Sequence, residues 1–228
     1  HSDLGLPMTV LAAAIEAARA AGAILHRHRD GPSQVSHKGA IDLVTEVDVA
    51  CESAIRRVLG RHTPHIPVLG EEEGGATDVD TRWIVDPLDG TTNFVHGFPY
   101  YCVSIALEVD GRLQLGVVLD PIRDKLYRAE RGAGAWCNDR RMAVSTCANL
   151  RGALIGTGFA YDRREKAAFY LRRFESVLIS AQGIRRAGAA ALDLAMVADG
   201  KLDGFWEFGL KRWDVAAGIV LIEEAGGR

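Results

Sequence analysis

The sequence WIVDPLDGTTNFVHG at residues 83–97 is an apolar run that stops at two acids, a proline, a glycine and two threonines. An apolar triplet followed by X-Pro and then Gly predicts a buried strand that ends in a turn, because the residue before proline is extended and glycine permits the chain to reverse. Asp86 and Asp89 are therefore expected side by side at the carboxyl end of a strand. Two carboxylates around a bend suit a hard cation such as Mg²⁺, although a plain turn explains the same spacing.

The residues after these acids favour the binding of an anion. Gly90 and Thr91 stand at the expected start of a helix. The first N–H groups of a helix have no partner within it, so they can hold a negatively charged group. The sequence thus predicts a corner that binds an anion beside a metal.

Composition and charge restrict the class of protein. The chain has 228 residues, of which 48% are hydrophobic, so it can bury a substantial core, and no linker-like stretch divides it. A formal net charge of −3 argues against nucleic-acid binding through a broad basic surface. Four cysteines without a C-x-x-C pair indicate buried, reduced thiols of a cytoplasmic protein. No apolar run reaches the roughly 20 residues of a membrane-spanning helix, and the start of the chain lacks the features of a signal peptide.

Periodic patterns predict the secondary structure. Helices are expected over residues 7–28 and from Thr45 onward, where Thr45 and Asp48 have the offset of a capping box. Strands are expected at 101–109 and 113–119, joined by Asp110 and Gly111 as a hairpin, and at 125–130. Strands at 153–156 and 204–208 alternate with helices at 164–181, 189–197 and 215–225, an order that favours layers of helix and sheet.

Two further acidic clusters follow apolar or aromatic residues. Glu71 and Glu72 come after the apolar residues 66–69, and Asp214 follows Trp213. Taken alone, the first cluster is a solvated turn and the second a helix N-cap.

Together these stretches resemble the inositol monophosphatase family. Residues 83–93 closely resemble the family's first signature, and residues 213–218 with 224–227 resemble its second. Residues 42–48 and 70–72 also agree, so the resemblance covers nearly the whole chain in the right order. It implies a five-layer αβαβα sandwich of the inositol monophosphatase and fructose-1,6-bisphosphatase type. Residues 1–228 would form one domain, with helices and a first, antiparallel sheet in 1–150 and a second sheet with helices in 151–228. Relatives generally continue beyond the position of Arg228, so this chain is expected to lack the family's C-terminal segment, and a homodimer is expected.

The resemblance also implies a set of metal ligands. Two or three Mg²⁺ ions would be held by the carboxylates of Glu71, Asp86, Asp89 and Asp214 and by the carbonyl of Leu88. A phosphate monoester needs several positive charges, because its oxygens repel the nucleophile and its alkoxide leaves poorly. The nucleophile would be a water molecule activated by the metal.

Proton transfer and phosphate binding are implied in the same way. Thr91, paired with Asp48, would help Glu71 take the proton of the water, and the N–H groups of Gly90 and Thr91 would hold a phosphate oxygen. Asp48 also fits the third position of a helix capped by Thr45, and this structural role remains an equal alternative.

The substrate side is implied by two further stretches. Glu207 stands where inositol-hydrolysing relatives place a glutamate that binds substrate hydroxyls; without the resemblance it is a charge at a strand edge. Gly188, Ala189 and Ala190 match a substrate-side turn, but many relatives carry Thr or Ser at the position of Ala189, so one polyol hydrogen bond is expected to be missing. The paired arginines at 163–164, 172–173 and 185–186 are interpreted as solvated faces, the last pair lying near this turn.

The resemblance thus predicts a Mg²⁺-dependent, lithium-sensitive phosphatase for inositol 1-phosphate or a similar polyol phosphate. Alternatives within the class are phosphatases for fructose 1,6-bisphosphate, histidinol phosphate or 3′-phosphoadenosine 5′-phosphate. An alternative of another class is a binding protein, since some bacterial members associate with the transcription machinery. Nothing in the sequence itself indicates binding to nucleic acid or to a transcription factor.

Overall fold

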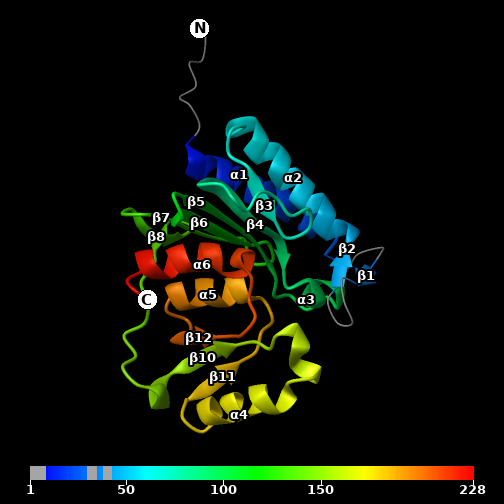
Figure 1. Cartoon of the computed structure of the whole chain (residues 1–228). Coiled ribbons are helices and arrows are strands. Elements are labelled where there is room, and N and C mark those ends of the chain that lie inside the picture. Colours follow the sequence, from blue (N-terminus) through cyan, green and yellow to red (C-terminus); the bar gives the residue numbers. More distant parts are fainter. Residues whose placement is uncertain (1–8, 30–34, 38–42) are drawn as a thin grey trace.

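The computed structural model describes residues 9–29, 35–37 and 43–228, which form an αβαβα sandwich (Figure 1). From one side to the other, the layers are a helix pair, a seven-stranded sheet, a second helix pair, a three-stranded sheet and a single helix. The helices are α1 (Val10–Arg27) with α2 (Glu46–His62), then α5 (Ala190–Ala198) with α6 (Arg212–Glu224), and finally α4 (Ala167–Leu178). The expected fold class is confirmed.

The larger sheet is almost entirely antiparallel. Its strands, in spatial as well as chain order, are β3 (Val68–Gly70), β4 (Thr81–Asp89), β5 (Cys102–Val109), β6 (Arg112–Asp120), β7 (Lys125–Glu130), β8 (Gly134–Cys137) and β9 (Arg140–Arg141). Only the pair β3 and β4 is parallel among these neighbours. The predicted hairpin of β5 and β6 is confirmed, and Asp110 and Gly111 in its turn have φ of 49° and 71°. Positive φ at both turn residues suits the twist of a tight hairpin.

Strand β4 explains the apolar run that opens the motif, because both of its faces are covered. Trp83 and Val85 pack in the core beneath α1 and α2, whereas Ile84 packs in the core beneath α5 and α6. Successive side chains of a strand point to opposite faces, so a strand covered on both sides is apolar throughout.

The strand does not end where the sequence predicts. It continues through Pro87 to Asp89, and its pairing with β5 shifts register between Asp86 and Asp89. Proline lacks an N–H donor, and a bulge is the place in a sheet where that donor is not needed. The two acids therefore lie on either side of a bulge rather than beyond the strand.

The smaller sheet has the order β11 (Gly183–Arg185), β10 (Leu154–Thr157) and β12 (Gly204–Trp206), with parallel pairing throughout. Strand β11 was not predicted, because three residues carry too little pattern. Helix α4 covers the outer face of this smaller sheet. The 3₁₀ turns η1 (Leu150–Gly152) and η2 (Tyr161–Arg164) precede α4 in the chain. Helix α6 begins at Arg212, three residues before the predicted start.

The N-terminal helices begin as their capping residues indicate. Thr9 caps α1, and Thr45 with Asp48 forms the predicted capping box of α2. Strands β1 (Val35–His37) and β2 (Leu43–Thr45) pair antiparallel, and the short helix α3 (Thr91–Val95) follows the motif. Asp42, part of the 42–48 stretch, lies outside the described residues.

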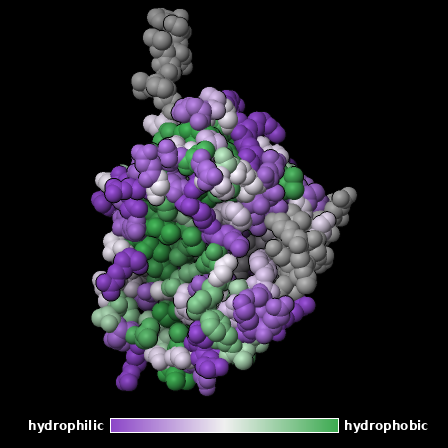
Figure 2. All heavy atoms as spheres, viewed as in Figure 1, coloured by the Kyte–Doolittle hydropathy of each residue, from purple (hydrophilic) through white to green (hydrophobic). Residues whose placement is uncertain are grey.

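Hydrophobic residues are not spread evenly over the surface. On the face in view, hydrophilic residues dominate around α1 and α2, whereas hydrophobic residues gather over α5 and α6 and near α4 (Figure 2). Within the described ranges, no helix is both long enough and apolar enough to cross a bilayer. All four cysteines are free thiols; three are buried as expected, but Cys147 is exposed.

Candidate functional site

A cleft of about 480 Å³ opens at the carboxyl end of β4, between the two sheets. Its walls come from the turn after β3, β4, α3, η2, the turn before α5, the segment after β12 and the first turn of α6. Ten of the residues singled out from the sequence line it, namely Glu71, Asp86, Leu88, Asp89, Gly90, Thr91, Gly188, Ala190, Glu207 and Asp214. Asp48 and Ala189 are not among the lining residues.

Asp86 and Asp89 are each held by a backbone N–H group. Asp86 is 1% exposed, and its Oδ1 accepts the N–H of Leu88 at 3.1 Å. Asp89 Oδ2 accepts the N–H of Ala191 at 2.6 Å, in the first turn of α5. The N-cap residue of α5 is Ala189, which has no side-chain oxygen, so Asp89 supplies the cap from another layer. The bulge of β4 and the start of α5 are thereby fixed relative to each other.

The acids of the cleft raise one another's pKa. Burial raises the pKa of Asp86 well above its usual range, and the charges of Glu71, Asp89 and Asp214 raise it further. Burial and the charge of Asp214 likewise raise the pKa of Asp89, while the hydrogen bond from Ala191 opposes the shift. Negative charge is thus concentrated on this wall. No basic side chain is among the main causes of the pKa shifts of Asp86 and Asp89. An all-oxygen donor set with excess negative charge fits a hard divalent cation.

The acids do not form a closed set of ligands. Within residues 9–29, 35–37 and 43–228, no three His, Cys, Asp or Glu side chains are arranged as a ready-made metal site. Carboxylates that repel one another separate unless a cation offsets their charge. The structure brings Glu71, Asp86, Asp89 and Asp214 to one wall, and their assignment as ligands stays a prediction.

Asp214 is the third residue of α6, not its N-cap. Its Oδ2 accepts the N–H of Lys211 at 2.6 Å, and Lys211 is the residue that precedes the helix. The carboxylate reaches back by one turn, which explains why α6 begins earlier than predicted. The Oγ of Ser104 on β5 donates to the carbonyl of Trp213 at 3.3 Å, so this turn is also anchored to the larger sheet.

Asp48 makes the contacts that both roles left open by the sequence require, and its role in proton transfer stays a prediction. Its Oδ2 accepts the N–H of Thr45 at 2.8 Å, as a capping box requires. Its Oδ1 lies 2.9 Å from the Oγ1 of Thr91, which is also 3.1 Å from the carbonyl oxygen of Leu88. Asp48 is 1% exposed, and burial raises its pKa. It therefore reaches the cleft only through the hydroxyl of Thr91.

The corner after Asp89 has the geometry of a helix start. Gly90 has a φ of 95°, a left-handed conformation that favours glycine, and a Cβ there would lie 3.0 Å from the carbonyl oxygen of Tyr100. Thr91 is the first residue of α3, so its N–H has no acceptor within that helix. Both residues line the cleft beside the acids.

The segments that follow the three strands of the smaller sheet bring Glu207 and several basic residues to the cleft. Burial raises the pKa of Glu207 to about 7, although the charge of Arg186 opposes the shift. Arg163, Arg186 and Lys211 also line the cleft. Arg163, interpreted from the sequence as part of a solvated face, thus also lines the cleft, because the 3₁₀ turn η2 forms part of the lining. Lys211 was missed, although it directly precedes the Trp-Asp element.

Ala189 does not line the cleft. It is 1% exposed and extended, and it packs close to Gly90 at the start of α5. A hydroxyl at this position could cap α5, and the expected loss of a substrate hydrogen bond stays a prediction.

Asn93 is a cleft residue that the sequence did not single out. Its Nδ2 donates to the carbonyls of Tyr100, at 2.6 Å, and Ala187, at 2.9 Å. It therefore joins α3 to the turn at 186–188, and only its place directly after the Thr-Thr pair could have pointed to it.

Comparison with known proteins identifies the family of this chain. The model of the inositol monophosphatase family matches residues 7–228. The chain is 49% identical over 222 residues to the Nus factor SuhB of Pseudomonas aeruginosa, which covers 94% of this chain and 82% of that protein. It is 50% identical over 196 residues to the inositol-1-monophosphatase of Rhizobium meliloti, covering 85% of this chain and 74% of that protein. The solved structure of the extragenic suppressor protein SuhB from Bartonella henselae superimposes with a TM-score of 0.91 and 45% identity, over 95% of this chain and 85% of that one. On these matches the chain belongs to the inositol monophosphatase family.

Proposed function

We propose that this chain is a Mg²⁺-dependent phosphomonoesterase that hydrolyses inositol 1-phosphate or a similar polyol phosphate. Family membership supports a phosphatase. The observation that carries the finer proposal is that Glu71, Asp86, Asp89 and Asp214, the acidic wall, line one cleft together with the start of α3 and with Glu207. The cleft thus offers one region to cations, one to a phosphate and one to hydroxyl groups.

Two or three Mg²⁺ ions would be held by the four carboxylates and by the carbonyl of Leu88. Bound Mg²⁺ neutralises phosphoryl oxygens and lowers the pKa of water. The acidic wall cannot itself bind a phosphate dianion, because like charges repel. The N–H groups of Gly90 and Thr91 would orient the phosphate from the positive end of α3.

Thr91 and Asp48 would move the proton of the attacking water. A threonine hydroxyl has one proton, and at 2.9 Å Asp48 Oδ1 can accept it. The Thr91 oxygen then keeps lone pairs for a proton from a water in the cleft, where Glu71 also lies. Burial raises the pKa of Asp48, which makes its carboxylate a better proton acceptor than an exposed one.

A substrate panel tests this proposal. Phosphate release should be measured for inositol 1-phosphate, fructose 1,6-bisphosphate, histidinol phosphate and 3′-phosphoadenosine 5′-phosphate, with Mg²⁺ and with a chelator. We expect the highest kcat/KM for inositol 1-phosphate, inhibition by lithium, and no turnover with the chelator. Phosphate release that survives the chelator would contradict the metal-dependent mechanism, and another best substrate would replace inositol 1-phosphate.

A second function, association with the transcription machinery, is favoured by one observation. The relatives at 49% and 43% identity from P. aeruginosa and Escherichia coli are named as Nus factors. A pulldown from extract of the source cells with wild type and D89N would test it. Binding of transcription proteins by both variants is expected; recovery of none of them by wild type would exclude this role.

A homodimer in the cytoplasm remains our expectation for the quaternary state and location. The hydrophobic residues over α5 and α6 are consistent with a contact surface (Figure 2). Light scattering at two protein concentrations would give the mass directly, and the monomer mass at both concentrations would exclude the dimer.

A further inference from the structure

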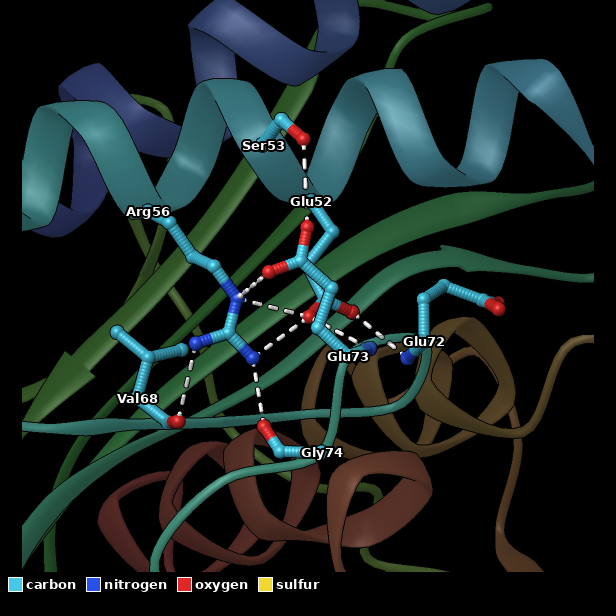
Figure 3. Close-up of polar contacts among 7 residues, drawn as sticks. All are labelled: Glu52, Ser53, Arg56, Val68, Glu72, Glu73 and Gly74. Carbon is cyan, nitrogen blue, oxygen red and sulfur yellow. Dashed lines mark hydrogen bonds and ion pairs between the residues drawn. The ribbon is translucent and has the colours of Figure 1, made fainter.

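A buried glutamate and an arginine lie behind the turn that carries Glu71. Glu52 on α2 is 0% exposed, and Arg56 follows it one helical turn later with a side chain that is 24% exposed. Neither residue lines the cleft. Figure 3 shows both side chains directed from α2 toward the segment 68–74.

Both oxygens of Glu52 accept backbone N–H groups of the turn. Oε2 accepts the N–H of Glu72 at 2.8 Å, and Oε1 accepts the N–H of Glu73 at 3.1 Å. Oε1 also accepts Nε and Nη2 of Arg56 at 2.9 and 2.7 Å. Two consecutive N–H groups that point at one carboxylate form an anion-binding turn, and here the anion belongs to the protein itself.

Arg56 holds both ends of the same turn. Its Nη1 donates to the carbonyl of Val68 at 3.2 Å, and its Nη2 donates to the carbonyl of Gly74 at 2.6 Å (Figure 3). Its Nε lies 3.3 Å from Oε2 of Glu73. A planar guanidinium with several fixed donors can make these contacts at once, which a lysine cannot.

The glycine at position 70 leaves room for the carboxylate of Glu52. A Cβ at residue 70 would lie 2.2 Å from Oε1 of Glu52, so Gly70 is required by close approach rather than by its backbone angles. The turn is also tied to the larger sheet, because the N–H of Glu71 donates to the carbonyl of Val85 at 3.2 Å, directly before Asp86. Residues 70–74, Glu52 and Arg56 therefore form one unit next to the acidic wall.

We propose that Glu52 and Arg56 are positioning residues that hold the turn so that Glu71 faces Asp86, and thereby set the affinity of the acidic wall for Mg²⁺. A buried carboxylate next to three further glutamates is unfavourable unless hydrogen bonds and an opposite charge compensate it. The hydrogen-bond partners of the Glu52 carboxylate are the side chain of Arg56 and the backbone N–H groups of the turn. Loss of Glu52 or of Arg56 would therefore release the turn. The inference rests on the proposed function, because it takes the acidic wall to be a cation site.

Asp120 offers a matched control. It is 0% exposed, and its carboxylate accepts the N–H groups of Ile122 and Arg123, at 2.9 and 3.1 Å, and Nη1 of Arg123 at 2.8 Å. This is the same arrangement of a buried carboxylate, two backbone N–H groups and an arginine, but it braces the turn after β6, which does not line the cleft. D120N therefore measures the structural cost of such a change at a turn that does not carry a cleft residue.

The test compares Mg²⁺ binding by the full chain of wild type, E52Q and D120N, using titration calorimetry and the rise in Tm that Mg²⁺ produces. In E52Q an amide NH₂ must face donors of Arg56 or of the turn, so both variants should have a lower Tm in a chelator. Only E52Q should bind Mg²⁺ more weakly, by roughly tenfold or more, as is common when the groups that support metal ligands are altered. Hydrogen exchange at the amides of residues 72 and 73 should rise in E52Q alone.

If E52Q does not fold, R56K provides the test, because lysine keeps the positive charge but lacks the planar guanidinium with its several fixed donors. We expect it to weaken Mg²⁺ binding in the same direction. Wild-type Mg²⁺ affinity in the folded variants, at a reduced Tm, would reduce the pair to a structural role and overturn the inference. These binding measurements need no substrate, so they stay separate from the proposed function, which fails if wild type binds Mg²⁺ but releases phosphate from no substrate.

Discussion

The two walls of the cleft are built in different ways. On the wall formed by β4 and the turn after β3, Asp86 and Asp89 accept the backbone N–H groups of Leu88 and Ala191. The wall formed by η2 and the segment after β12 carries aromatic rings instead, with Phe208 at 41% exposure lying 5.3 Å from Phe169 between ring centroids. Under the proposed function, the first wall would carry the chemistry and the second would select the alcohol part of the substrate.

The largest effect is expected from D89N, because it removes a charge from the rigid wall while its amide oxygen can still accept the N–H of Ala191. We expect kcat to fall by about 10³-fold, near the upper range for loss of one group that stabilises the transition state. Phosphate release by D89N should be measured beside circular dichroism. Activity within a factor of a few of wild type would remove Asp89 from the chemistry.

The next effect concerns the path from Thr91 to Asp48. T91A should lower kcat by roughly 10²-fold, the scale of general acid–base catalysis, because Asp48 then has no hydroxyl link to the cleft. T91S keeps the hydroxyl and is the matched control, for which we expect most of the activity to return. Equal losses in T91A and T91S would indicate that the methyl group, and not the hydroxyl, matters.

A change on the opposite wall should affect substrate binding more than turnover. E207Q should raise KM for a polyol phosphate by about tenfold, because a charged hydrogen-bond acceptor is lost. It should leave kcat for an aryl phosphate without hydroxyl groups close to that of wild type. An equal loss of kcat for both substrates would place Glu207 in the chemistry instead.

Glu207 also predicts a dependence of stability on pH. Burial raises its pKa from 4.5 to about 7, so the folded chain keeps this proton to a higher pH than the unfolded chain does. The free energy of unfolding must therefore fall as the pH rises through this window. Denaturant unfolding in a chelator should show this fall for wild type relative to E207Q, and parallel curves for the two would contradict the raised pKa.

The smallest effect is expected from A189S. Ala189 is the N-cap of α5 and has no side-chain acceptor, so a serine can bond a first-turn N–H that Asp89 does not use. We expect a gain of about 0.5–1 kcal/mol in the free energy of unfolding, at the low end for capping because Asp89 already supplies part of the cap. KM should not change, since residue 189 does not line the cleft. A lower KM would place residue 189 on the substrate side.

The sequence by itself determined the elements whose cause is local. The apolar run at 83–85 specifies a strand buried on both faces, Thr45 with Asp48 specifies the start of α2, and Asp110 with Gly111 specifies the β5–β6 hairpin. These signals are periodicity, capping and turn chemistry, which act within a few residues of chain. The order of the acidic motifs likewise pointed to the family before any contact was known.

Only the tertiary structure decided what depends on residues far apart in the chain. Asp89 caps a helix about a hundred positions later, Arg163 lines the cleft although its neighbours in sequence indicate a solvated face, and Glu52 supports a turn of a different element. The sequence does not indicate in which direction a short side chain such as that of Ala189 points. The motif at 83–97 therefore specified which groups the site contains, whereas the packing of the layers decided which partners hold them in place.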